Sequence, residues 1–365
     1  MKKIAFLDLK RFHSELENEI ELKLKEVFCK YNFIGGEEVS SFEKNFASFS
    51  SIKYCVGVGN GLEALFLILK AIEIEKEDEV IVPSNTFIAT WLAVSMCGGK
   101  PIPVEPDPIT YNIDTTKIEA LITPKTKAII PVHLYGRAAN MTEINKIADT
   151  YGLHIVEDAA QAQGATHSNK PVGSFSIASA TSFYPGKNLG AFGDAGAVIT
   201  DNVKIADKIR MLGNYGSKLK YSHELKGINS RLDEIQAAVL NIKLKHLNKW
   251  NQERKDIAQL YGNLIENTLI QLPNCMNDNE SVWHLYVIRT KSREQLRNFL
   301  YEKNIETGIH YPIPCHMQKC YRGEGYMNLK QTEVMAKEIL SLPIYPGITK
   351  NEIAYIAESI NKFKV

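Results

Sequence analysis

Lys187 is the residue whose surroundings are hardest to explain as an ordinary surface position. It stands in ATSFYPGKNLGAFGDAGAVIT, residues 180–200, a stretch that is small, apolar and rich in glycine. Gly190, Gly193 and Gly196 keep the backbone that follows slim and leave room for a bulky group. A lysine in such a cleft loses hydration, so the pKa of its ammonium group should fall. The neutral amine can then bond to a carbonyl carbon as an imine.

An imine-forming lysine needs a carbonyl partner, and pyridoxal phosphate (PLP) is the usual one. The pyridine nitrogen of PLP needs a carboxylate that keeps it protonated, and Asp158 ends the apolar run LHIVED (153–158). Consecutive side chains of a strand point to opposite faces, so Glu157 and Asp158 cannot both face a ligand. A helix start is expected at 159–161, so an ordinary helix N-cap is the alternative interpretation of Asp158.

The phosphate of PLP needs a nest of backbone N–H groups at a helix N-terminus. The segment GVGNGLEALFLIL (57–69) offers one, because Gly59-Asn60-Gly61 separates a strand from a helix. Ser182 could add a hydroxyl from the strand that precedes the lysine. Phe87, just beyond a strand end in VPSNTFIATW, could stack on the pyridine face, with a place in the core as its alternative. No single one of these features is decisive, but their occurrence together and in this order along the chain favours PLP.

Seven short apolar runs predict the strands that must position these residues. Several are almost wholly apolar rather than alternating, which is typical of strands covered on both faces. Helical patterns at 61–72 and 140–152 lie between them, so we expect crossover connections and a mostly parallel seven-stranded sheet in an α/β fold. Ligands bind such sheets at the carboxyl ends of the strands. The predicted strands are 53–58, 79–83, 100–105, 127–132, 153–158, 180–184 and 196–200.

The pattern changes after residue 200. Residues 231–260 are strongly helical, and we expect one long helix that bridges two parts of the chain. A strand at 282–290, a helix at 292–304, a proline-rich loop and a last helix follow. The length of 365 residues suggests about two domains. We predict a large PLP-binding domain over 1–250 and a smaller C-terminal α/β domain over 251–365.

Composition narrows the class of protein. Hydrophobic residues make up 44% of the chain and the formal net charge is +1, so neither a nucleic-acid partner nor another polyanion is expected. The N-terminus lacks a signal-peptide core, and no run approaches the ~20 apolar residues of a membrane span. The cysteines form no C-x-x-C pair, which is typical of a reducing compartment; they are Cys29, Cys55, Cys97, Cys275, Cys315 and Cys320. We predict a cytoplasmic protein.

Three motifs together are highly specific: EDAAQAQGA (157–165), SFYPGKNLGAFGDAGAV (182–198) and GINSRLDEIQAAVL (227–240). They closely resemble the sugar-nucleotide aminotransferase family, also called the DegT/DnrJ/EryC1/StrS family. The similarity runs from FLDLK (6–10) to LPIYPGIT (342–349). The resemblance implies the fold of type I PLP-dependent transferases, a homodimer, and active sites shared between the two subunits.

The resemblance also implies roles for individual residues. Lys187 would form a Schiff base with PLP and later shuttle protons, and Asp158 would pair with the pyridine nitrogen. Gln161 would lie by the ring hydroxyl, and Phe87 would stack on the ring. Asn229 would reach the phosphate from the other subunit, although its position also suits a helix N-cap. The remaining phosphate-binding residues would be Gly61, Leu62 and Ser182.

One position departs from the family pattern. Many members have a threonine where Leu62 stands, and Leu62 can offer the phosphate only its backbone N–H. The version GNGLEAL (59–65) resembles members that use L-glutamate to aminate C3 of a dTDP-linked 3-keto-6-deoxyhexose. The alternative is the same chemistry at C4 of a 4-keto-6-deoxyhexose. Lys187 argues against the dehydratase branch of the family, in which histidine replaces it.

The segment HYPIPCHMQKC (310–320) is a candidate for the sugar-nucleotide pocket, as the resemblance suggests. His310, Tyr311 and His316 are its candidate substrate-binding residues. The segment also gathers histidines and cysteines, but their irregular spacing and two stiffening prolines disfavour zinc. No metal site is therefore predicted.

A second segment, NYGSKLKYSHELKG (214–227), combines three lysines with Tyr215 and Tyr221. One interpretation is a solvated, mobile loop. The other is a segment that binds the diphosphate of the substrate, across the dimer if the active sites are shared.

Two other functions compete with aminotransfer. GVGNGL begins like a dinucleotide-binding G-x-G-x-x-G motif, but Leu62 stands where the third glycine should be. Tyr184 and Lys187 lie one residue too close for the Tyr/Lys pair of short-chain reductases, so a nicotinamide oxidoreductase is disfavoured. A PLP-binding regulator without turnover is the other alternative, although neither a helix-turn-helix nor a basic arm is apparent.

Overall fold

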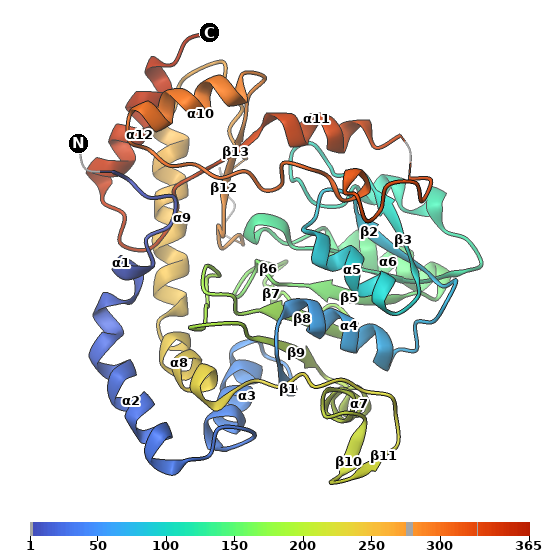
Figure 1. The fold of residues 1–365 in the computed structure, drawn as a ribbon. Coiled ribbons are helices and arrows are strands. Elements are labelled where there is room, and N and C mark those ends of the chain that lie inside the picture. The colour runs from blue at the N-terminus through green and yellow to red at the C-terminus, as the bar shows by residue number, and fades with distance from the viewer. Residues whose placement is uncertain (1–2, 275–279, 327) are drawn as a thin grey trace.

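The computed structural model describes residues 3–274, 280–326 and 328–365. A central sheet carries helices on both faces, and a smaller group of C-terminal elements lies beside it around one end of the long helix α9 (Figure 1). Cys275, one of the six cysteines, lies outside the described residues.

The sheet has seven strands in the order β1-β9-β8-β5-β4-β2-β3. Every neighbouring pair from β3 to β8 is parallel, and β9 is antiparallel to both β8 and β1. The prediction of a mostly parallel seven-stranded sheet is confirmed, with β8 two residues earlier than predicted. The strands are β1 (Tyr54–Val58), β2 (Glu79–Pro83), β3 (Lys100–Val104), β4 (Thr126–Ile129), β5 (His154–Asp158), β8 (Ala178–Ser182) and β9 (Gly196–Thr200).

Alternate residues of the strands face different helical layers. In β2, Val80 and Val82 join the core cluster that contains residues of α4 (Gly61–Ala71), α5 (Ile88–Met96) and α7 (Val203–Gly213). Ile81, between them, packs on the other face with residues of α6 (Met141–Tyr151). Both faces of the strand are therefore covered, which explains why its sequence is apolar at every position from 80 to 82.

The expected single helix over 231–260 is wrong. The structure has two helices, α8 (Glu234–Leu244) and α9 (Leu247–Leu264), separated by Lys245 and His246. Neither separating residue is glycine or proline, and apolar spacing resumes at once with buried Leu247 and Trp250. The sequence pattern therefore hides the break, because tertiary packing rather than local propensity sets it.

The C-terminal elements build a second core. Antiparallel strands β12 (Tyr286–Arg289) and β13 (Ile339–Leu342) pack with α9, α10 (Arg293–Glu302) and α12 (Lys350–Lys362). The predicted strand 282–290 is thus shorter than expected, and the predicted helix 292–304 is α10. Ile4 also joins this core and pairs with Ile305, so the chain begins against its C-terminal part. The division at residue 250 remains a prediction.

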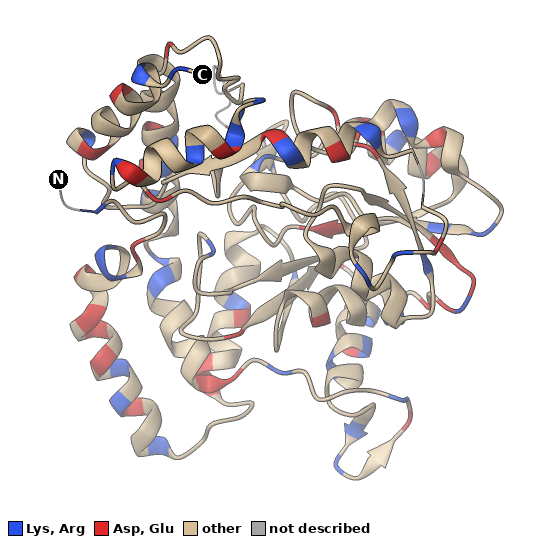
Figure 2. Ribbon diagram, turned by 45° about the horizontal axis from the view of Figure 1, so that its top comes forward, with Lys and Arg blue, Asp and Glu red and all other residues tan. Residues whose placement is uncertain are grey.

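Other elements frame this body. In the view of Figure 1, α2 (Glu17–Lys30) extends along one side. The small hairpin of β10 (Ser217–Leu219) and β11 (Ser222–His223) projects below the sheet. Basic and acidic residues are interspersed along α2, as the blue and red segments of its ribbon show (Figure 2). In the part of the chain that the structure describes, no helix is both long and apolar enough to span a bilayer. The remaining elements are α1 (Leu9–His13), α3 (Glu37–Phe49), β6 (Thr166–His167), β7 (Lys170–Pro171) and α11 (Lys330–Glu338), with short 3-10 helices at Ser14–Leu16, Thr115–Lys117, Glu119–Leu121, Leu134–Gly136 and Cys315–Met317.

Candidate active site

A cavity of about 460 Å³ lies at the carboxyl ends of β5 and β8, between the sheet and the C-terminal elements. This is the edge at which a mostly parallel sheet is expected to bind a ligand. The cavity brings together most of the residues that the sequence singled out, from segments far apart in the chain. They are Gly61, Leu62, Phe87, Asp158, Gln161, Ser182, Lys187, His310 and Tyr311.

Lys187 lies in a tight loop between β8 and β9. Its backbone N–H donates to the carbonyl oxygen of Tyr184 at 2.8 Å, which closes the turn. Gly190 has to be glycine, because a Cβ there would lie 2.4 Å from the carbonyl oxygen of Pro185. The side chain of Lys187 is half-buried in the cavity wall. The glycine-rich sequence therefore folds into a compact loop that presents one amine to the cavity.

The electrostatic surroundings of Lys187 favour a neutral amine. Burial lowers the pKa of its ammonium group from 10.5 to about 8, and the nearby carboxylate of Asp158 opposes this fall. The lowered pKa expected from the sequence is therefore present. At neutral pH roughly a tenth of such an amine is unprotonated, far more than for a solvated lysine.

Two helices fix the lysine loop from behind. The side-chain amide of Asn188 donates to Oδ1 of Asn251 at 2.8 Å and to the carbonyl of Val282 at 2.9 Å. Nζ of Lys243 donates to the carbonyl of Gly190. Because Lys243 belongs to α8 and Asn251 to α9, the position of the loop depends on the helix pair that joins the two cores.

Asp158 ends β5 with its carboxylate buried at the cavity. The hydroxyl of Thr90 donates to Oδ2 at 2.9 Å, and the N–H of Ala160 donates to Oδ1 at 3.2 Å. Burial raises the pKa of this carboxyl group, while the two hydrogen bonds and the charge of Lys187 oppose the rise. Residues 159–161 form no helix, so the alternative role of Asp158 as a helix N-cap is excluded.

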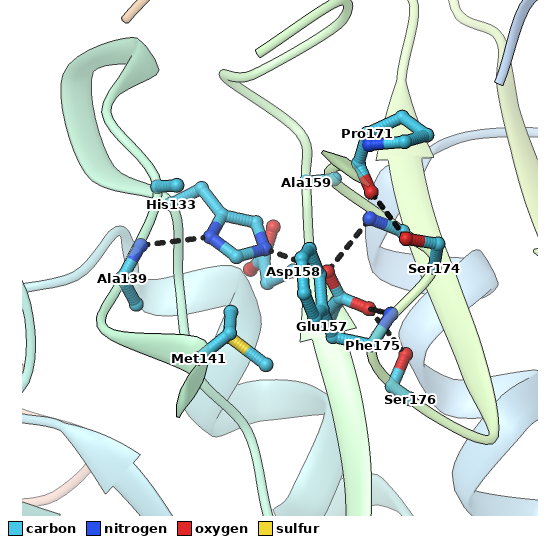
Figure 3. Close-up of polar contacts among 12 residues, drawn as sticks. His133, Ala139, Met141, Glu157, Asp158, Ala159, Pro171, Ser174, Phe175 and Ser176 are labelled. Carbon is cyan, nitrogen blue, oxygen red and sulfur yellow. Dashed lines mark hydrogen bonds and ion pairs between the residues drawn. The ribbon is translucent and has the colours of Figure 1, made fainter. Parts of the chain in front are cut away.

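Glu157 points to the opposite face of the sheet, as the alternation of strand side chains requires (Figure 3). His133 Nδ1 accepts the N–H of Ala139 at 3.0 Å, so its Nε2 carries the proton and donates to Glu157 Oε1 at 3.1 Å. The same buried carboxylate accepts from the segment after β7. These donors are the N–H groups of Gly173 and Phe175 and the hydroxyl of Ser176. Glu157 is therefore fully engaged in anchoring β5.

The N-terminus of α4 opens onto the cavity. Asn60 caps the helix by accepting the N–H of Glu63 at 2.9 Å. Gly61 has to be slim, because a Cβ there would lie 2.8 Å from Cβ of Ser182. Gly196 of β9 is constrained in the same way by the carbonyl of Asn60. The close approach of α4 and β8 places helix N–H groups beside the Ser182 hydroxyl, an arrangement suited to an anion.

Two aromatic rings form one side of the cavity. Phe87 precedes α5, is 50% exposed, and lies 5.2 Å from the ring of Tyr311. Its half exposure excludes the alternative of a core position. Gln161 accepts the N–H of Tyr135 at 2.8 Å and donates from Nε2 to the hydroxyl of Tyr311 at 3.0 Å. Gln161 therefore holds Tyr311 at the cavity.

The two histidines of the 310–320 segment lie in different places. Nδ1 of His310 lies 2.9 Å from Oγ of Ser341, and burial together with the charge of Lys187 lowers the pKa of this imidazole to about 4. His316 does not line the cavity; its Nε2 lies 3.2 Å from Glu333 of α11. Among the described residues, no group of three His, Cys, Asp or Glu side chains could hold a metal ion.

Three further predicted residues lie outside this cavity. Tyr215 and Tyr221 are 51% and 84% exposed around the β10–β11 hairpin. Asn229 is also exposed, and it is not a helix N-cap because α8 begins after Asp233. The prediction of Asn229 as an N-cap is wrong, because α8 starts several residues later than the local sequence suggests. None of the three lines the cavity of its own chain.

The cavity also contains two residues that sequence reasoning missed, the charged Arg254 and the histidine His284, whose pKa is lowered by burial. Arg254 of α9 is 1% exposed and lines the cavity together with His284. A usable signal was present, because Arg254 shares a helix stripe with buried Ile257, Ala258 and Tyr261 at spacings of three, four and seven. His284 offered no comparable signal, since a histidine within an apolar strand is equally typical of a core.

The fold and this site define an α/β aminotransferase. The chain belongs to the DegT/DnrJ/EryC1/StrS aminotransferase family, which it matches over residues 14–361. It is 48% identical to a dTDP-3-amino-3,6-dideoxy-alpha-D-galactopyranose transaminase of Aneurinibacillus thermoaerophilus, over 99% of each chain. It is 45% identical to a dTDP-3-amino-3,4,6-trideoxy-alpha-D-glucose transaminase of Streptomyces venezuelae, over 99% of this chain and 96% of the relative.

A solved structure gives the same result. The crystal structure of S. venezuelae DesV in complex with a ketimine intermediate superposes with a TM-score of 0.97 and 45% identity, covering 99% of this chain and 98% of that one. The predicted fold class and the family resemblance are therefore confirmed.

Proposed function

We propose that this aminotransferase uses PLP to move the amino group of L-glutamate to C3 of a dTDP-linked 3-keto-6-deoxyhexose, giving a 3-amino-3,6-dideoxyhexose. One observation carries the proposal. Lys187, with its lowered pKa, shares a cavity with the buried carboxylate of Asp158. The names of the relatives, which are transaminases forming 3-amino sugars linked to dTDP, support the choice of substrate.

The residues around the cavity fit PLP. The N-terminus of α4 at Gly61 and Leu62, with the hydroxyl of Ser182, would hold the phosphate. Phe87 would cover one face of the ring, and Asp158 would contact the ring nitrogen. A Cβ on residue 61 would collide with Ser182, so glycine keeps this cradle open. When bound, PLP supplies an aldehyde that bonds covalently to amines and a ring that accepts electrons.

Two side chains would do most of the protein's chemistry. With a pKa of about 8, Lys187 Nζ would be neutral often enough to bond to the aldehyde carbon of PLP. As a free amine it would take a proton from the reacting carbon of the substrate and return it. Asp158 is kept able to ionise by the Thr90 hydroxyl and the Ala160 N–H, so it can hold a proton on the ring nitrogen. Tyr311, held by Gln161, would help to exclude water.

We further propose that the enzyme acts as a cytoplasmic homodimer with shared sites. The exposure of Asn229, Tyr215 and Tyr221 supports this arrangement, because each would be free to reach the cavity of a second copy. Asn229 would then contact the cofactor phosphate, and the tyrosines the substrate. His310 and Tyr311 would bind the sugar from within the same chain. His316, paired with Glu333, would act only by holding the 310–320 segment.

The regiochemistry is tested by giving the holoenzyme L-glutamate with either the 3-keto or the 4-keto dTDP-6-deoxyhexose and identifying any amino sugar by mass spectrometry and NMR. We expect an amino sugar from the 3-keto substrate. Product from the 4-keto substrate alone would replace C3 by the alternative, C4.

The reaction class is tested separately by absorption spectroscopy. The PLP form should absorb in the visible or near-ultraviolet region and lose that absorption on mixing with L-glutamate. A nicotinamide cofactor would give no absorption in the visible region, and a PLP-binding regulator without turnover would keep the absorption after glutamate is added.

A further inference from the structure

Arg254 is a buried cation at the cavity with no part in holding PLP or in proton transfer. Its guanidinium group is 1% exposed and lines the cavity. Nη1 donates to the carbonyl of Ile344 at 2.7 Å and contacts the carbonyls of Trp283 and His284 at 3.4 Å. Nε is buried without a hydrogen-bond partner. Burial lowers the pKa of Arg254 to about 10, so the group remains charged at neutral pH.

Other arginines of the chain show what Arg254 lacks. Arg289 donates to the carboxylate of Glu338 at 2.6 Å, and Arg11 to that of Glu352 at 2.7 Å. Within residues 3–274, 280–326 and 328–365, no ion pair is found for Arg254. A buried charge without an ion pair is costly even where it contacts carbonyl dipoles, and an anion bound in the cavity would offset that cost.

The position of Arg254 limits which anion can reach it. The backbone carbonyl of His284 accepts from Arg254. Nδ1 of the same histidine lies 3.1 Å from Oδ1 of Asn188, the residue after Lys187. The charges of Lys187, Arg254 and His310 all contribute to lowering the pKa of His284, after the larger effect of burial. The charges of Lys187 and Arg254 therefore act on the same corner of the cavity, beside His284.

The proposed reaction involves four anionic groups. The side-chain carboxylate of L-glutamate is separated from the reacting carbon by two methylene groups. The cofactor phosphate is accounted for by the N-terminus of α4. The diphosphate of a sugar nucleotide is joined to C1, so at least two ring carbons separate it from a reacting C3, and its bulk suits the mouth of the cavity. The α-carboxylate of an amino acid is bonded directly to the reacting carbon. Only that carboxylate has to lie deep in the cavity, near Lys187.

We propose that Arg254 binds the α-carboxylate of the amino donor. Nη1 of Arg254 would stay bonded to the carbonyl of Ile344, and the remaining N–H groups would donate to the carboxylate. A guanidinium recognises a planar carboxylate better than an ammonium does. This inference rests on the proposed aminotransferase function. It predicts that the half-reaction with the amino donor depends strongly on Arg254 and the half-reaction with the sugar only weakly, although both use Lys187.

The test separates the two half-reactions of the holoenzyme by absorption. Arg254→Met should raise the KM for L-glutamate by about 30-fold or more, the loss typical of an unpaired buried charge. The half-reaction with the dTDP-keto sugar should change by less than about threefold. Calorimetry gives a readout independent of turnover: glutarate, a dicarboxylate without an amine, should bind the wild type and lose most of its affinity in the variant.

Two further variants keep the outcome decisive. Arg254→Lys retains a cation but loses the planar fork, so its affinity for glutarate should fall about fivefold to tenfold even if Arg254→Met does not fold. Arg289→Met, outside the cavity, removes a guanidinium and should leave both half-reactions unchanged. Equal losses in both half-reactions, or unchanged donor and glutarate binding in the Arg254 variants, would overturn the inference. A wild type that does not react with glutamate would instead refute the proposed function.

Discussion

Two lysines of this chain, one half-buried and one fully enclosed, share a lowered pKa but differ in their surroundings. Lys187 faces a cavity and a carboxylate, and its pKa is about 8. Lys243 is fully enclosed, its pKa is about 7, and burial alone causes the fall. Its Nζ lies 2.7 Å from Nε2 of His13 and about 5 to 6 Å from the ring centres of Phe12 and Phe192.

The comparison shows that a lowered pKa does not by itself mark a reactive lysine. Lys243 has the lower pKa, yet it borders neither Asp158 nor the cavity. Its amine instead donates to the carbonyl of Gly190 and so helps to hold the loop that carries Lys187. Access to a ligand and a nearby acid distinguish the lysine that reacts from the lysine that supports it.

Replacing each lysine should give the largest contrast. Lys187→Ala should lower kcat by about 10³-fold or more, because proton transfer at the reacting carbon loses its only positioned amine, while weak PLP binding remains. Lys243→Met should keep kcat within about fivefold. Steady-state rates with L-glutamate and the keto sugar check both. Near-normal turnover in Lys187→Ala would remove this lysine from the mechanism.

Asp158→Asn should have the next largest effect, a loss of about 10²-fold in kcat. The amide keeps the size of the side chain but cannot hold a proton on the ring nitrogen. Rates of both half-reactions by stopped-flow absorption are the measurement. Glu157→Gln is the matched control on the other face of the sheet; it should affect the midpoint of thermal unfolding more than the rate. The opposite pattern would contradict the assignment of the two faces.

The pKa of Lys187 predicts a pH dependence for cofactor attachment. Because the neutral amine is the reactive form, the rate at which the free protein takes up PLP should rise about tenfold between pH 7 and 9 and then level off. Asp158→Asn should shift this profile to lower pH, since the carboxylate raises the pKa of Lys187. A rate independent of pH over this range would show that the amine is not the titrating group.

The lowered pKa of Lys243 should affect the free energy of unfolding rather than the rate of catalysis. Its pKa is about 7 in the folded chain and 10.5 in the unfolded chain, so unfolding takes up a proton between these values and stability rises with pH. The free energy of unfolding of Lys243→Met, relative to wild type, should therefore fall by up to about 1.4 kcal/mol per pH unit from pH 7 to 8.5. His13, with a pKa of about 4, stays neutral throughout. If the free energies of unfolding of wild type and Lys243→Met changed equally with pH, the lowered pKa of Lys243 would be contradicted.

The sequence predicts best where one local pattern determines the outcome. The seven strands are recognisable because burial on both faces makes them continuously apolar. Lys187 is recognisable because a single charge interrupts such a run, and Asp158 because it is the last residue of one. The cavity then follows from the rule that parallel strands expose their carboxyl ends at one edge.

Other features depend on contacts that no local pattern records. The break between α8 and α9 contains no helix-breaking residue, and the pairing of His316 with Glu333 joins segments whose register is set by the tertiary fold. Arg254 gives only part of a signal, because its place on a buried helix stripe does not show what the stripe faces. On a helical wheel it looks like a misplaced cation, and only the structure shows that its stripe reaches the cavity.

The most direct test of the central claim is to locate the covalent bond. The protein is loaded with PLP, reduced with borohydride and digested, and the labelled peptide is sequenced by mass spectrometry. The account predicts one pyridoxyl group, on Lys187, with Lys243 unlabelled. A label on Lys243, or on neither lysine while PLP remains bound, would contradict it.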